Sequence, residues 1–317
     1  MNEAAMYLTA TKPNEATRAR RLAYITFETP DLERLMSYYT DVVGLSLVER
    51  TSQVAYLGVP GQNYCVVLKS GKETQCTGLS FQISPQEGDL DALHKLVKSQ
   101  EIAAEMRQDA HPSIGTGLYF KDPKGTDIEV FAKREIRGGE SLSRGIAPEK
   151  LGHVAFSVTD IDKIVRFYVD VLGFRESDWI GDFFAFLRCS PDHHTVNFVR
   201  GKTDRMHHVA FELKDWSHVQ TACDTLGKRQ IPLLWGPGRH GVGHNIFTYH
   251  RDTDGHIIEL FTEIDRINDE DLGYFEPRPW HEEFPQRPKV WQPSLAAANL
   301  WGIEAPHTMM EKQNRHD

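Results

Sequence analysis

Three side chains in the second half of the chain are of the types that hold a catalytic metal ion. His153, His208 and Glu259 each lie in a short apolar run that is typical of a β-strand. Two imidazoles and one carboxylate can bind one face of an octahedral ion and leave three positions open, as in non-haem Fe(II) oxygenases. The same donor set accepts Mn(II). The three residues are far apart in the chain, so the predicted metal site depends on the strands that carry them.

An internal duplication indicates that these strands occupy equivalent places. Leu22-Ala-Tyr-Ile-Thr-Phe27 returns as Leu151-Gly-His-Val-Ala-Phe156, and residues 122–131 return as 252–261. The offset is 129 residues at the first strand (153 − 24) and 130 at the last (259 − 129). A repeat of this kind predicts one supersecondary unit that is used again. We therefore predict an α+β protein of two tandem βαβββ-repeat domains, residues 20–135 and 148–265, with a C-terminal tail over 266–317.

The first copy lacks the two histidines. Tyr24 stands where His153 stands, Gly78 stands where His208 stands, and only the carboxylate is kept, as Glu129. Residues that are needed only for packing should appear in both copies. We therefore predict that the first domain keeps the fold without a metal, and that the histidines of the second domain serve a metal rather than the core.

Local signals place further elements in the first copy. Thr29-Pro30 predicts a helix start with Pro30 in the first helical position, and Gly44 predicts its end in a left-handed conformation. A second helix is expected near 88–99, and the charged, Gly-bearing stretch 132–149 is expected to be a linker. Strands are expected near 53–59, 63–69, 78–83 and 127–131.

Composition limits the classes of function. The chain of 317 residues has a net charge of −9, which argues against a nucleic-acid partner because such a protein needs a basic face. Four cysteines without CxxC spacing suit a reducing compartment. No apolar run approaches the length of a membrane span, and the N-terminus does not resemble a signal peptide. We expect a cytoplasmic homo-oligomer that contacts neither nucleic acid nor membrane.

Other histidines and aromatic residues surround the predicted ligands in sequence. Adjacent side chains on a strand point to opposite faces, so one member of each pair His193-His194 and His207-His208 faces the metal. His194 matches Tyr64 of the first copy, and His207 is expected to support the site from outside. His244, His250 and His256 are expected on the surface or in packing. An apolar wall that holds a ring is expected from Trp235, Phe247, Phe184 and Phe186.

The second half resembles the type I extradiol ring-cleavage dioxygenases of the vicinal oxygen chelate superfamily, whose fold is shared with glyoxalases and bleomycin-resistance proteins. The resemblance covers roughly residues 20–265. It is most specific in Gly236-Pro-Gly-Arg-His-Gly241, Tyr249 and Asp254-Gly-His-Ile-Ile-Glu259. It is closest to the homoprotocatechuate and biphenyl-diol branches. Trp235 and Ala155 stand where homoprotocatechuate enzymes have arginine and asparagine, so a carboxylated catechol is not the expected substrate.

The resemblance implies a role for each residue of the site. His153, His208 and Glu259 would hold Fe(II), with Mn(II) as the alternative. His194 would act as the acid–base residue, and His240 and Tyr249 would contact the substrate hydroxyls. Trp235, Arg239 and Phe247 would bind the substrate. The implied partners are a catechol-type or polyhydroxybenzene substrate and O2, and the implied reaction is extradiol cleavage in aromatic catabolism.

Two other functions are compatible with the same fold. Glyoxalase-type lyases and isomerases usually take ligands from both halves of a composite site, which Tyr24 and Gly78 disfavour. A non-catalytic binding protein would need no metal set. Iron or manganese would favour the dioxygenase, zinc or nickel the lyase, and no metal the binder. The tail carries Trp280, Trp291 and Trp301 and is expected to cover the second domain as a lid or a subunit contact.

Overall fold

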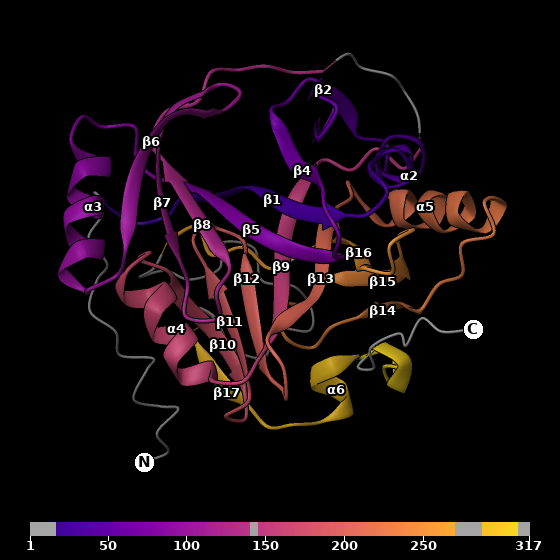
Figure 1. Cartoon of the computed structure of the whole chain (residues 1–317). Coiled ribbons are helices and arrows are strands. Elements are labelled where there is room, and N and C mark those ends of the chain that lie inside the picture. Colours follow the sequence, from indigo (N-terminus) through magenta and orange to yellow (C-terminus); the bar gives the residue numbers. More distant parts are fainter. Residues whose placement is uncertain (1–16, 140–144, 270–286, 310–317) are drawn as a thin grey trace.

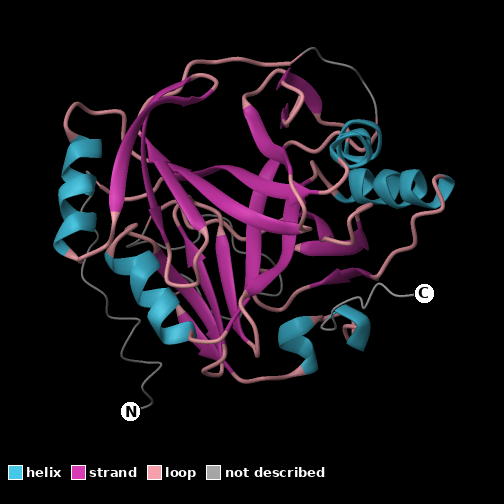
Figure 2. Cartoon of the chain, in the orientation of Figure 1, coloured by secondary structure: helices cyan, strands magenta, loops and turns pink. Residues whose placement is uncertain are grey.

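The computed structural model describes residues 17–139, 145–269 and 287–309 of the chain. It contains two large sheets with helices at their periphery (Figures 1 and 2). The first sheet has eight strands in the order β2-β3-β4-β1-β5-β8-β7-β6, and the second has nine in the order β14-β15-β16-β13-β9-β12-β11-β10-β17. The predicted α+β class with two tandem repeat domains is confirmed.

Each domain contains the βαβββ unit twice, not once. In the first domain the two units place their first strands side by side and antiparallel at the centre of the sheet, with three strands beyond each of them. The units are β1 (Arg21–Thr29), α2 (Leu32–Tyr38), β2 (Ser46–Arg50), β3 (Val54–Gly58) and β4 (Tyr64–Ser70), then β5 (Gln75–Gln82), α3 (Asp89–Ser99), β6 (Ala104–His111), β7 (Ile114–Lys121) and β8 (Asp127–Phe131).

The second domain repeats this arrangement and adds an edge strand from the tail. Its central pair is β9 with β13, again antiparallel, and β17 (Lys289–Trp291) pairs with β10. The two units are β9 (Lys150–Val158), α4 (Ile161–Asp170), β10 (Arg175–Ile180), β11 (Phe184–Arg188) and β12 (Val196–Arg200), then β13 (Arg205–Glu212), α5 (Trp216–Lys228), β14 (Trp235–Arg239), β15 (Ile246–Arg251) and β16 (Ile257–Thr262). The tail also forms α6 (Leu295–Ala298) and a 3₁₀ turn at His307–Met309.

The local predictions are confirmed in part. Gly44 ends the first helical segment with φ 87°, as expected for a residue without a Cβ. The helix α2 begins at Leu32 rather than at Pro30, because the Asp31 carboxylate caps it by accepting from the Arg34 amide at 3.0 Å. The strand β6 was not predicted. Most of its residues are exposed at the sheet edge, and its apolar alternation is limited to Ala104 and Met106.

One continuous apolar core joins the two domains. It contains residues from both sheets, such as Ile25 and Phe81 of the first and Phe156 and Phe211 of the second. Strand β1 contacts β9, and β5 contacts β13, so the central strands of the two domains meet in this core. The other face of each sheet carries smaller apolar clusters of its own. Two cavities, one in each domain, are lined by residues of these opposite faces.

Three of the remaining histidines belong to the packing. His250 is fully buried, with its Nε2 2.6 Å from the Tyr38 hydroxyl of the first domain. His244 is buried and pairs with Asp265, and the His256 side chain lies 2.9 Å from Asp252. Of the two roles expected for these histidines, surface or packing, the structure shows packing. In the part of the chain that the structure describes, no helix is long and apolar enough to span a membrane.

Candidate metal centre

Three neighbouring strands bring the predicted ligands onto one face of the second sheet. His153 lies on β9, His208 on β13 and Glu259 on β16, and β13 pairs with both of the others. Ala210 is in register with His153 on one side and with Glu259 on the other. His208 lies two residues before Ala210 and therefore on the same face. Sheet register alone thus places three distant residues together.

The ligand atoms converge on one point. The Glu259 Oε2 atom lies 3.0 Å from the Nε2 atom of His153 and 3.0 Å from that of His208, and the two nitrogens are 3.3 Å apart. All three side chains are buried. Asn245 donates to the other carboxylate oxygen, Oε1, at 2.9 Å, which leaves Oε2 facing the histidines. Two imidazole nitrogens and one carboxylate oxygen fit Fe(II) or Mn(II).

The protonation states also suit a metal ion, because ligands must be deprotonated to bind. Burial alone would raise the pKa of Glu259, but the neighbouring His153 and His208 hold it well below its ordinary value. Burial lowers the pKa of His208, so its ring is neutral. The His208 Nδ1 atom lies 2.7 Å from Nδ1 of His207. His207 thus contacts the nitrogen of His208 that faces away from Glu259, where a hydrogen bond can orient the imidazole, and it also lines the cavity beside the ligands.

A chain of hydrogen bonds leads from the tail to His194. Asp178 Oδ2 accepts from the Trp291 indole at 2.8 Å and lies 3.1 Å from His193 Nε2. His193 Nδ1 lies 3.0 Å from His194 Nδ1, and the His194 ring packs edge-on against His153 with centroids 4.3 Å apart. A carboxylate only accepts, so His193 carries its proton on Nε2 and its Nδ1 accepts from His194. This leaves Nε2 of a neutral His194 as a proton acceptor.

His240 and Tyr249 form a second polar pair beside the ligands. The His240 Nδ1 atom lies 2.6 Å from the Ala298 carbonyl, so it carries the proton, and Nε2 accepts from the Tyr249 hydroxyl at 3.0 Å. Burial lowers the pKa of His240 to about 4. Burial, with the charge of Glu259, raises the pKa of Tyr249 well above its ordinary value. Both groups are neutral at pH 7.

The ligands open into a cavity of about 300 Å³ whose wall is mainly apolar. Phe184 and Phe186 stack in this wall with centroids 4.4 Å apart. Asn197 is an exception, because its buried Oδ1 atom has no hydrogen-bond partner among the described residues. Of the residues named from sequence, the cavity is lined by His153, Ala155, His194, His207, His208, Trp235, His240, Tyr249, Glu259, Phe184 and Phe186.

Arg239 and Phe247 are not among the residues that line the cavity, although sequence reasoning named both for substrate binding. The Arg239 guanidinium donates to the His244 carbonyl at 2.7 Å and to Glu263 at 2.8 Å, which draws it into the structure. Phe247 is fully buried behind His240, with ring centroids 3.9 Å apart. These two residues therefore stiffen the loop and the His240 ring instead of facing a substrate.

The tail supplies part of the cavity wall. The sequence predicted that the tail covers the second domain but not which of its residues do so. Ser294, Ala297, Ala298 and Met309 line the cavity. The tail is held to the second domain by β17 and by the Trp235 indole, which donates to the Ile303 carbonyl at 3.0 Å. Trp280 lies outside the described residues. The tryptophans of the tail predicted that it packs on the protein, but they did not indicate which residues it contacts.

The fold and this centre define the class of protein. Models of the Glyoxalase/Bleomycin resistance protein/Dioxygenase superfamily match residues 21–130 and 150–260, so the chain belongs to that superfamily. The manganese-dependent 2,3-dihydroxybiphenyl 1,2-dioxygenase of Geobacillus genomosp. 3 is 26% identical over 86% of this chain and 93% of its own length. Curated relatives include an iron-dependent extradiol dioxygenase as well.

Two solved structures have the same fold over nearly the whole chain. The Mn(II)-bound glyoxalase from Novosphingobium aromaticivorans is 28% identical, with a TM-score of 0.81 over 92% of this chain and 94% of its own. The homoprotocatechuate 2,3-dioxygenase from Arthrobacter globiformis is 25% identical, with a TM-score of 0.80 over 96% and 94%. The resemblance to ring-cleavage dioxygenases that the sequence motifs predicted is confirmed.

Proposed function

We propose that the chain is an extradiol dioxygenase, which cleaves the ring of a catechol-type substrate by inserting both atoms of O2 at a mononuclear Fe(II) site. Mn(II) is the alternative metal. One observation carries the proposal: the buried face of His153, His208 and Glu259 opens into an apolar cavity in which His194, His240 and Tyr249 are the polar neighbours. All three ligands come from one domain.

The metal ion, when bound, would chelate both catechol oxygens and bring O2 beside the ring, which removes most of the entropic cost of their meeting. The protein residues have separate tasks. His194 Nε2 is unprotonated and can accept a proton from a substrate hydroxyl, and its Nδ1 is fixed by His193. The Tyr249 hydroxyl can donate a hydrogen bond to a substrate oxygen as negative charge develops on it, and the unprotonated His240 Nε2 can accept from a substrate hydroxyl.

The walls indicate the kind of substrate. Phe184 and Phe186 present flat apolar faces that suit an aromatic ring, and no arginine or lysine is among the residues that line the cavity. A carboxylated catechol would lose its hydration there without gaining a cation. The free Asn197 Oδ1 atom would accept from a hydroxyl or amine substituent. We therefore expect alkyl-, aryl- or hydroxylated catechols to be better substrates than homoprotocatechuate.

Oxygen uptake by protein that is purified without air and loaded with Fe(II) tests the proposal. The panel contains catechol, alkyl- and aryl-catechols, homoprotocatechuate and trihydroxytoluenes. We expect one O2 per substrate and a yellow ring-opened product, and no uptake by His153→Ala. The absence of uptake on every catechol, at full Fe(II) occupancy, would contradict the proposal.

A glyoxalase-type lyase or isomerase is the second candidate, because the Mn(II)-bound glyoxalase has the highest identity of the two structures compared above. Such a reaction consumes no oxygen. A protein that converts a glyoxalase substrate under nitrogen with Mn(II), and that ignores catechols in air, would establish this second function. The position of all ligands in one domain argues for the dioxygenase.

We also propose that the protein works as a cytoplasmic homo-oligomer. The four cysteines are free, as expected in a reducing compartment. Large apolar side chains of the tail remain exposed, and Trp301 packs edge-on against the exposed Trp216 with centroids 5.7 Å apart. Sedimentation velocity should give a dimer or tetramer, which Trp301→Ser weakens. A monomer at micromolar concentration would contradict the oligomer.

A further inference from the structure

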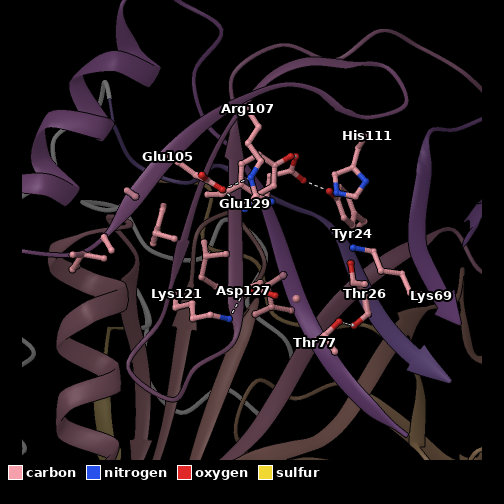
Figure 3. Close-up of a pocket in the computed structure, with 18 residues that line it drawn as sticks. Tyr24, Thr26, Lys69, Thr77, Glu105, Arg107, His111, Lys121, Asp127 and Glu129 are labelled. Carbon is pink, nitrogen blue, oxygen red and sulfur yellow. Dashed lines mark hydrogen bonds and ion pairs between the residues drawn. The ribbon is translucent and has the colours of Figure 1, made fainter. Parts of the chain in front are cut away.

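The first domain has a cavity at the place where the second domain has its metal centre. It measures about 540 Å³ and is lined by residues of β1, β4, β5, β6, β7 and β8 (Figure 3). Tyr119 is in register with Glu129, as Tyr249 is with Glu259. Tyr24 occupies the place of His153. The two cavities are therefore equivalent positions of the repeat.

In this cavity, hydroxyl groups surround the carboxyl that corresponds to the metal ligand Glu259. The Glu129 carboxyl contacts the hydroxyls of Tyr24 and Tyr119 and accepts from Ser80 at 2.9 Å. Burial raises the pKa of Glu129 to about 8, with Arg134 opposing it. The carboxyl is therefore mainly neutral at pH 7. The floor of the cavity offers neutral hydroxyl groups, which do not hold a divalent cation.

Three basic side chains line the cavity, Lys69, Arg107 and Lys121, together with the carboxylates Glu105 and Asp127. Burial, together with the charges of Lys69, Arg107 and Arg134, lowers the pKa of His111 to about 4. His111 is therefore neutral at pH 7. Arg134 lies over the Tyr64 ring at 3.7 Å and donates to the Tyr64 carbonyl, so it is fixed against Tyr64 and is not among the residues that line the cavity.

Lys69 is the cation that is available to a ligand. Arg107 pairs with Glu105, and Lys121 pairs with Asp127. Lys69 makes no hydrogen bond or ion pair with any described residue, although it is half-buried; burial lowers its pKa, and the more distant charge of Asp127 opposes this shift. In Figure 3 its amine extends towards Tyr24 and Thr26. A half-buried ammonium without a partner favours an anion that would replace its lost hydration.

Aromatic rings line the same cavity as this ammonium. The His111 ring lies 5.6 Å from Tyr24 and 6.5 Å from Tyr119, measured between centroids. These separations are in the range at which aromatic faces and edges attract one another. A ligand with a flat conjugated body would find ring contacts on these walls while its charge faces Lys69.

We propose that the cavity of the first domain binds a small organic carboxylate with a flat, conjugated body. The carboxylate pairs with Lys69, and the body packs among Tyr24, His111 and Tyr119. This site is separate from the metal centre and does not depend on the function of that centre.

Calorimetric titration of the metal-loaded full chain with benzoate tests the proposal. A charge-assisted hydrogen bond accounts for about a tenfold to hundredfold change in affinity. We expect Lys69→Met to weaken benzoate by about that factor, Lys69→Arg to retain it, and Lys98→Met on the exposed face of α3 to leave it unchanged. Benzyl alcohol, which lacks the charge, should bind at least about tenfold more weakly than benzoate.

The location of the ligand is tested by a variant of the other cavity. His240→Ala alters the metal-side cavity and should leave benzoate affinity unchanged, while sorbate, an open-chain dienoate, should depend on Lys69 as benzoate does. A loss of benzoate binding in His240→Ala together with unchanged binding in Lys69→Met would place the ligand at the metal centre and overturn the proposal. So would the absence of benzoate binding by the unsubstituted protein.

Discussion

The two cavities occupy the same place in the two copies of the repeat and differ in almost every property that matters to a ligand. The second copy has an apolar wall, two imidazoles and a carboxylate that faces them. The first has three hydroxyls around a mainly neutral carboxyl, two ion pairs and the unpaired Lys69 ammonium. The comparison teaches that the curvature of the sheet makes the cavity, while side chains at a few register positions determine its chemistry.

Replacement of each of the two equivalent glutamates by glutamine should produce the largest difference in activity between the copies. Glu259→Gln removes the only anionic ligand, so we expect loss of the bound metal and a fall in activity beyond the roughly hundredfold that changes outside the ligand set cause. Glu129→Gln replaces a carboxyl that is mainly neutral at pH 7, and activity should stay within about twofold. Metal analysis and initial rates check both. Equal losses in the two variants would mean that the first domain takes part in catalysis.

The aromatic wall belongs to the second copy alone. Phe186→Ala removes one ring of the Phe184–Phe186 stack, and an aromatic pair contributes enough to raise KM for an alkyl-catechol about threefold to tenfold. The effect on kcat should be smaller, because the hydrogen-bonding groups are unchanged. Phe186→Leu should recover part of the loss. An unchanged KM in steady-state rates would show that the ring of the substrate lies elsewhere.

Restoring the missing ligands should give the first copy a metal site. In Tyr24→His combined with Gly78→His, the two imidazoles would face Glu129 as in the second domain. A Cβ at Gly78 would meet the Asp127 carbonyl at 3.3 Å, so the strands need to shift only by a few tenths of an ångström. We expect bound Mn(II), measured by mass spectrometry, to rise from one to two per chain. A folded double variant that still binds one would show that more than the ligand set was lost.

The buried carboxyl of the first copy should affect the pH dependence of stability. Its folded pKa of about 8 lies above the ordinary 4.5, so its contribution is present below pH 4.5 and is lost as the pH rises through 8. The slope for one proton is at most about 1.4 kcal/mol per pH unit. Urea midpoints between pH 5 and 8 should therefore fall more steeply for the unsubstituted protein than for Glu129→Gln. Parallel curves would contradict a neutral Glu129.

The ligand set could be predicted from sequence because it depends on register in central strands. His153, His208 and Glu259 lie on strands whose apolar pattern and duplication are visible in the chain. The apolar wall from Phe184 and Phe186 could be predicted for the same reason.

Other parts of the two sites could not be predicted from the sequence, because they depend on long-range packing. Arg239 carries the motif of a binding residue, yet its partners Glu263 and the His244 carbonyl draw it inward. The wall from Ala297 and Met309 is set by how the tail packs. The charge of the first cavity arises only when Lys69 of β4 and Arg107 of β6 come to the same face. The start of the first helix at Leu32 depends on the Asp31 cap, a signal that competes in sequence with the neighbouring Pro30.

Incorporation of isotopic oxygen tests the central claim most directly. The Fe(II)-loaded protein is mixed with a good catechol under ¹⁸O2, and the product is analysed by mass spectrometry before its oxygens exchange with water. The account predicts that both labelled atoms appear in one ring-opened product molecule. A product without label, or with a single labelled atom and an intact ring, would contradict extradiol cleavage at the His153, His208 and Glu259 centre.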